Sequence, residues 1–86
     1  MYNLGLKYQH GVGVKIDKNK AIELYQRAVD KGNADAMFNL GVMYQNGDGV
    51  AVDKKKAFEL VKRASDKGNA KAMNNLGRMY LFGEGV

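Results

Sequence analysis

The chain has 86 residues, which is enough for one small domain. It contains no cysteine, and this excludes a disulfide framework and a thiolate metal site. Its 14 lysines and arginines outnumber its 9 acidic residues, but they are not gathered on one face with aromatic residues between them, so we expect no nucleic-acid partner. No apolar run approaches the roughly 18 residues that a membrane span needs, so we expect no membrane partner.

The chain repeats itself with a period of 36 residues. Residues 1–36 and 37–72 are identical at 23 of 36 positions, and residues 73–86 begin a third copy in the same register. A fixed period of this length is typical of a solenoid, in which each unit buries its apolar face only against its neighbours. We therefore predict one solenoid domain over residues 1–86 and expect it to belong to a longer array.

Each copy is predicted to contain two helices, A and B. In chain order the expected helices A, B, A, B and A cover residues 2–10, 18–31, 34–46, 54–67 and 70–82. Before the second helix A and the second helix B, Asn33 and Asp53 stand where their side chains can accept hydrogen bonds from the first free N–H groups of a helix. Gly47 and Gly68 stand where helices end. The pattern predicts an all-α superhelix of helix-turn-helix repeats.

One glycine recurs inside helix A of all three copies, as Gly5, Gly41 and Gly77. Glycine costs about 1 kcal/mol relative to alanine inside a helix, so its recurrence indicates that another helix approaches closely at this point. The expected contacts are small residues of helix B, namely Ala21 and Ala57, or Ala28 and Ala64.

One further string covers most of a unit: Ala36-x-x-x-Leu40-Gly41-x-x-Tyr44-x-x-Gly47-x-Gly49-Val50-x-x-Asp53-x-x-Lys56-Ala57. In spacing, glycines and the Leu-Gly-x-x-Tyr core it resembles the Sel-one-like repeat (SLR), a relative of the tetratricopeptide repeat. The resemblance implies an α-solenoid that serves as a non-catalytic adaptor or scaffold for proteins. We therefore predict a module that binds a peptide or a protein surface.

In tetratricopeptide-like solenoids helix A lines the concave face, so the residues of helix A that do not point inward are candidates for partner binding. The predicted partner-binding residues are Tyr2, Asn3, Leu6, Phe38, Asn39, Val42, Gln45, Asn74, Asn75 and Arg78. Asn3, Asn39 and Asn75 hold the same position in the three copies. Their amides could hold a peptide backbone, since an amide both donates and accepts. The alternative is that each asparagine bonds its own neighbouring helix or loop.

Catalysis is not expected from this composition. His10 is the only histidine, Ser65 is the only serine and threonine is absent, so neither a catalytic triad nor a metal site can be assembled. We predict no catalytic, cofactor-binding or metal-binding residue and no cofactor.

Two other functions stay open, a self-assembling structural segment and an accessory docking domain of a larger protein. The last helix A has no helix B after it to cover Leu76 and Tyr80, and the first helix A has no unit before it, which could expose Leu4 or Tyr8. Uncovered ends of this kind could drive self-association.

Overall fold

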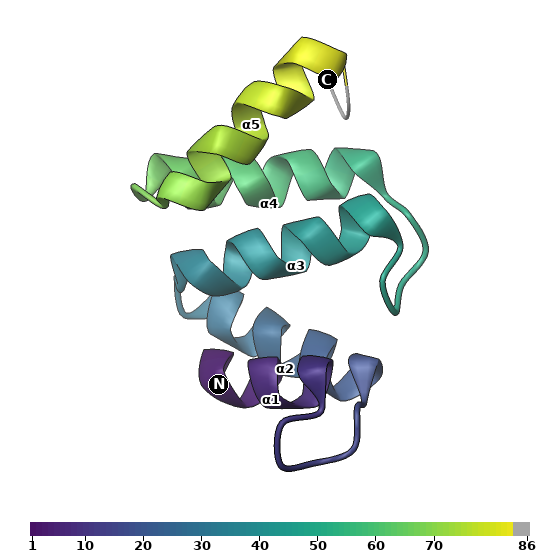
Figure 1. Ribbon diagram of the computed structural model, residues 1–86. Coiled ribbons are helices and arrows are strands. Elements are labelled where there is room, and N and C mark those ends of the chain that lie inside the picture. Colours follow the sequence, from purple (N-terminus) through teal and green to yellow (C-terminus); the bar gives the residue numbers. More distant parts are fainter. Residues whose placement is uncertain (84–86) are drawn as a thin grey trace.

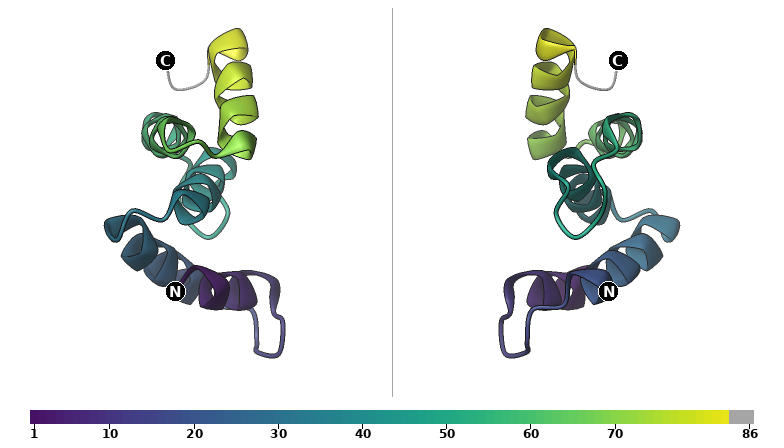
Figure 2. Two further views of the ribbon diagram at one scale, coloured as in Figure 1. Left: turned by 90° about the vertical axis from the view of Figure 1, so that its left-hand side faces the viewer. Right: turned by 90° about the vertical axis from the view of Figure 1, so that its right-hand side faces the viewer.

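The computed structural model describes residues 1–83, and within this range the chain forms five helices and no strand. They are α1 (Tyr2–His10), α2 (Lys18–Asp30), α3 (Ala34–Asn46), α4 (Lys54–Asp66) and α5 (Ala70–Phe82). Each helix packs against the helices that precede and follow it in the sequence, so the helices form a stack with α1 and α5 at opposite ends (Figure 1). Figure 2 shows that the direction of the helices turns steadily along the stack. The predicted helical-repeat solenoid is confirmed.

Local signals set the helix ends. The side chain of Asn33 accepts a hydrogen bond from the Ala36 N–H at 2.8 Å, and that of Asp53 accepts one from the Lys56 N–H at 3.0 Å. Gly47 closes α3 with a left-handed backbone, at φ 69°. The predicted bounds agree with the structure except that α2 and α4 each end one residue earlier, because the backbones of Lys31 and Lys67 leave the helical conformation.

The core lies between the helices and is made of apolar side chains from α2, α3, α4 and α5. Its largest fully buried members are Tyr25, Met37, Leu40, Met43, Met79, Val29 and Val61. Each such side chain contributes roughly 1.5–3 kcal/mol relative to its exposed state. Tyr44, which belongs to the Leu-Gly-x-x-Tyr core of the repeat, is only half-buried, and the Lys56 ammonium lies 5.0 Å from the centre of its ring.

The recurring glycine of helix A marks a close approach in α1 and α3, and of the expected contacts Ala57 is found beside Gly41. A Cβ on Gly5 would lie 2.7 Å from the ring of Tyr25, and a Cβ on Gly41 would lie 2.9 Å from a methyl group of Val61. Tyr25 and Val61 hold the same position in their repeats, and the side chain at this position is the nearest to the glycine in both. The backbone oxygen of Ala57 is a further contact, 3.3 Å from the position of a Gly41 Cβ.

Helix α5 exposes the face that α3 buries. Met37 is 1% exposed, whereas Met73, at the same position of the next repeat, is 49% exposed. A Cβ on Gly77 would meet no atom of the described residues within 4 Å, in contrast to one on Gly41. Tyr80 is exposed as expected, Leu76 stays half-buried, and at the other end of the stack Leu4 is exposed while Tyr8 is half-buried. The third copy extends to residue 86, and residues 84–86 lie outside the described range.

Candidate functional site

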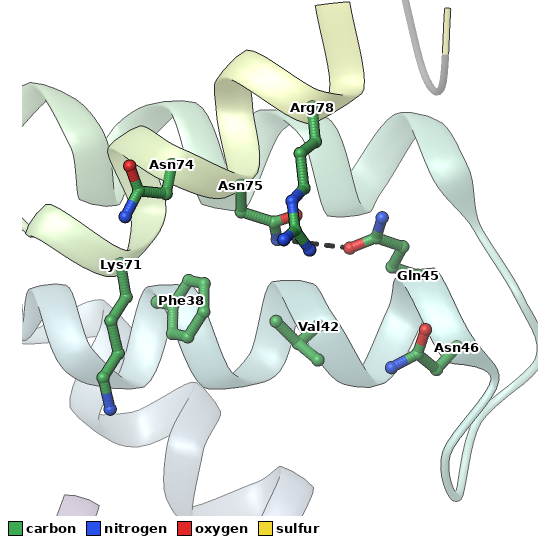
Figure 3. Close-up of a pocket in the computed structure, with 8 residues that line it drawn as sticks. All are labelled: Phe38, Val42, Gln45, Asn46, Lys71, Asn74, Asn75 and Arg78. Atoms are coloured by element: carbon green, nitrogen blue, oxygen red, sulfur yellow. Dashed lines mark hydrogen bonds between the residues drawn. The ribbon is translucent and has the colours of Figure 1, made fainter. Parts of the chain in front are cut away.

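A groove of about 430 Å³ lies between α3 and α5 (Figure 3). Its lining residues are Phe38, Val42, Gln45 and Asn46 of α3, and Lys71, Asn74, Asn75 and Arg78 of α5. On each helix these residues recur at three- and four-residue spacing, which places them on one side of the helix. Helix α4 does not contribute to the lining, because its apolar stripe packs on the other faces of α3 and α5.

The groove combines three kinds of side chain. Phe38 and Val42 are half-buried and supply apolar surface on α3, and four amide side chains supply donors and acceptors. Lys71 lies beside Phe38, and Arg78 lies further along α5 near Gln45 (Figure 3). None of the eight lining residues is acidic.

Six of the ten residues predicted to bind a partner line this groove, namely Phe38, Val42, Gln45, Asn74, Asn75 and Arg78. The structure adds Asn46 and Lys71, which were not among the ten. Their positions follow the same helical spacing, since Asn46 stands one turn after Val42 and Lys71 one turn before Asn75. That spacing places both residues on the same side of their helices as the other six.

The other four predicted residues lie elsewhere. Tyr2 is half-buried with its ring 6.1 Å from that of Tyr25, and it borders a separate cavity of about 280 Å³. Leu6 is half-buried against the core, and Asn3 is exposed on α1. Asn39 is half-buried and donates a hydrogen bond to the Tyr25 hydroxyl at 3.4 Å. These four residues are therefore not part of the groove between α3 and α5.

Two of the three recurring asparagines have partners on neighbouring helices, as the alternative interpretation expected. Asn39 bonds Tyr25 of α2, and Asn75 donates to the side-chain oxygen of Gln45 on α3 at 3.2 Å. The second of these bonds joins the two sides of the groove (Figure 3). Asn75 therefore helps to fix α5 against α3.

The Tyr25 hydroxyl sits between two repeats and acts as a neutral donor. It donates to the Gln9 side-chain oxygen at 2.5 Å while it accepts from Asn39. Burial raises the pKa of Tyr25 above its usual value of 10.0, and this effect outweighs the hydrogen bond from Asn39, which lowers the pKa. Tyr25 therefore keeps its proton across the physiological range.

Residues 1–83 hold no group of three or more histidine, cysteine, aspartate or glutamate side chains placed to bind a metal ion together. No helix in that part of the chain is long and apolar enough to cross a membrane.

Comparison with known proteins places these features in a family. The model of the Sel1 repeat matches residues 1–33, 34–69 and 70–86, so it covers the whole chain with the 36-residue period and divides it three residues earlier than the sequence analysis does. No curated protein matches the sequence.

Two solved structures are similar over 99% of the chain. One is a protective antigen of uropathogenic Escherichia coli strains with an SLR fold, at 40% identity and a TM-score of 0.96. The other is a Sel1 repeat protein from Oxalobacter formigenes, at 35% identity and a TM-score of 0.92. The chain spans only 18% and 35% of their respective lengths. The chain belongs to the Sel1 repeat family.

Proposed function

We propose that the chain is a non-catalytic protein-interaction module and that its groove between α3 and α5 binds an extended peptide segment of a partner protein. Sel1 repeats generally mediate protein interactions and typically form non-catalytic scaffolds. The observation that carries the choice of this groove is its lining, which sets two half-buried apolar side chains beside a row of amides.

An extended peptide suits this lining for a physical reason. Its backbone N–H and C=O groups are unpaired and need partners, and the amides of Asn46 and Asn74 can each donate and accept. Its side chains alternate in direction, so one set can pack on Phe38 and Val42 while the other faces α5. The volume of about 430 Å³ falls within the roughly 300–1,000 Å³ of typical ligand sites.

A display library of short random peptides tests the proposal. Peptides enriched on the wild-type chain are expected to lose most of their affinity for Val42→Gln and for Phe38→Ala. The matched control is Val52→Gln, because Val52 is an exposed apolar residue between α3 and α4, outside the groove. Enriched peptides that bind all variants equally, or a failure to enrich any peptide, would contradict the proposal.

Self-assembly is a second candidate, favoured by the exposed apolar side chains of Met73, Tyr80, Leu81 and Phe82 on α5. Two copies could cover these side chains by packing their α5 helices against each other. Sedimentation at increasing protein concentration tests this candidate. A shift to dimers that disappears in Leu81→Lys with Phe82→Lys, and persists in Val52→Lys, would support it, whereas a monomer at all concentrations would exclude it.

A further inference from the structure

We infer that the groove between α3 and α5 selects an extended peptide in which acidic and apolar side chains alternate. This inference rests on the proposed function, because it names the chemistry of the segment that the groove takes. The observation behind it is the charge of the lining, because its eight described residues include two cationic side chains and no carboxylate.

Within residues 1–83 no carboxylate neutralises the two cations. Lys71 and Arg78 are exposed, and neither forms an ion pair within residues 1–83. Elsewhere in the same range, Lys18 is held by Asp48 at 2.7 Å and Arg27 by Glu23 at 3.1 Å. A carboxylate that enters the groove would therefore meet a cation that forms no ion pair with another described residue.

The two cationic side chains of the groove are not found at the equivalent positions one repeat earlier. One repeat earlier, the position of Lys71 is occupied by Asp35 and that of Arg78 by Val42. Asp35 has a structural contact instead, since it accepts a hydrogen bond from the Asn69 side chain at 2.8 Å. Because the repeat folds without a cation at either position, Lys71 and Arg78 are free to serve recognition.

The spacing of the lining residues fits an alternating peptide. Phe38 and Val42 are one turn apart on α3, about 6 Å along the helix axis. Side chains on one face of an extended peptide are spaced by about 6.7 Å, so two apolar side chains can reach both residues. The intervening side chains then point toward α5. There Lys71 and Arg78 are two turns apart, about 10.5 Å, and their long side chains can reach carboxylates near both ends of the segment.

A single-stranded nucleic acid would also bring negative charge to this groove. Such ligands stack successive bases on several aromatic side chains. Phe38 is the only aromatic residue in the lining, so the apolar surface suits aliphatic side chains of a peptide better than a row of bases.

Fluorescence anisotropy with three labelled peptides tests the inference. The probes are Glu-Leu-Glu-Leu-Glu and its counterparts with glutamine or lysine in place of glutamate. We expect the glutamate peptide to bind roughly fivefold to tenfold more tightly than the glutamine peptide, which is the size of a few exposed ion pairs, and the difference to shrink as salt is added. The lysine peptide should bind most weakly.

Two double variants, each of which removes two positive charges, test whether the preference for glutamate arises in the groove. Lys71→Gln with Arg78→Gln should remove the preference for glutamate over glutamine. Lys62→Gln with Arg63→Gln lowers the net charge of the chain equally, on exposed positions of α4 outside the groove, and should keep the preference.

The outcomes separate the two proposals. If the glutamate and glutamine peptides bind equally tightly and both lose affinity for Val42→Gln, the acidic preference is overturned. The proposal that the groove binds peptides would then still stand. If the α4 variant removes the preference for glutamate as fully as the groove variant does, the preference comes from the net charge of the chain and not from the groove, and the inference is overturned. Tighter binding of a labelled oligothymidine than of the glutamate peptide would also overturn the inference.

Discussion

Asn75 donates directly to Gln45 at 3.2 Å, whereas the equivalent pair one repeat earlier, Asn39 and Gln9, is joined through the hydroxyl of Tyr25. The difference follows from one position, because Val61 stands where Tyr25 stands in the first repeat and has no hydroxyl. The same two residues pack on the helix A glycine, so one position decides both the helix contact and the polar link between repeats.

Tyr25→Phe is expected to destabilise the chain by about 0.5–1.5 kcal/mol, because it removes the hydroxyl that links Gln9 to Asn39. Urea unfolding followed by circular dichroism measures this change. Tyr80→Phe is the matched control, since Tyr80 is exposed and contacts Phe58 with its ring. Equal losses in the two variants would show that the Tyr25 hydroxyl makes no special contribution.

The stability of the wild-type chain should fall at alkaline pH, in part through Tyr25. Its pKa is raised in the folded chain, so the folded state holds this proton more tightly than the unfolded state does. The resulting stabilisation is complete below the unfolded-state pKa of 10.0 and is lost as pH rises through the folded-state value. Unfolding free energies measured from neutral to alkaline pH should fall less steeply for Tyr25→Phe. Parallel curves would contradict this expectation.

Gly41→Ala and Gly77→Ala form a matched pair at one repeat position. At Gly77 a new Cβ meets nothing within 4 Å, so Gly77→Ala should stabilise the chain by up to about 1 kcal/mol through helix propensity. At Gly41 the Cβ would lie 2.9 Å from Val61 and 3.3 Å from the backbone oxygen of Ala57. Overpacking of this kind typically costs about 1–3 kcal/mol, which offsets the gain in propensity. Thermal melting should therefore rise for Gly77→Ala and fall for Gly41→Ala, and a rise in both would show that the helix contact is not tight.

Leu40→Ala should cost about 2–5 kcal/mol, because Leu40 is 0% exposed and the substitution leaves a cavity. A loss of this size is a large share of the stability of a domain this small. Leu4→Ala makes the same chemical change at the equivalent position of the first repeat, where the side chain is 43% exposed, and should cost much less. Calorimetry of the two variants gives the comparison. Similar losses would mean that Leu4 is covered in solution.

Several features of the fold could be predicted from the sequence because they depend on neighbours along the chain. The caps at Asn33 and Asp53 and the glycine at Gly47 act on their own helix, so the helix bounds could be placed to within one residue. The 36-residue period implies that each unit repeats the contacts of the last, and this predicts a solenoid without knowledge of any helix pair. The helical spacing also placed Phe38 and Val42 on one side of α3, where they line the groove with residues of α5.

The contacts between helices could be determined only from the tertiary structure. Nothing in the repeat pattern distinguishes Gly41 from Gly77, yet Gly41 lies against Val61 and Gly77 is open, because α3 has a helix packed on that face and α5 has none within the described residues. The hydrogen-bond partners of Asn39 and Asn75 could not be predicted from the sequence either. They depend on whether the preceding helix B carries a tyrosine, as at Tyr25, or a valine, as at Val61. The groove itself arises only where α5 lies beside α3, which brings Lys71 and Arg78 opposite residues at least 25 positions away in the sequence. Helix ends are set by local backbone hydrogen bonds, whereas contacts between helices depend on side chains of different elements, and the sequence specifies those only through the packed structure.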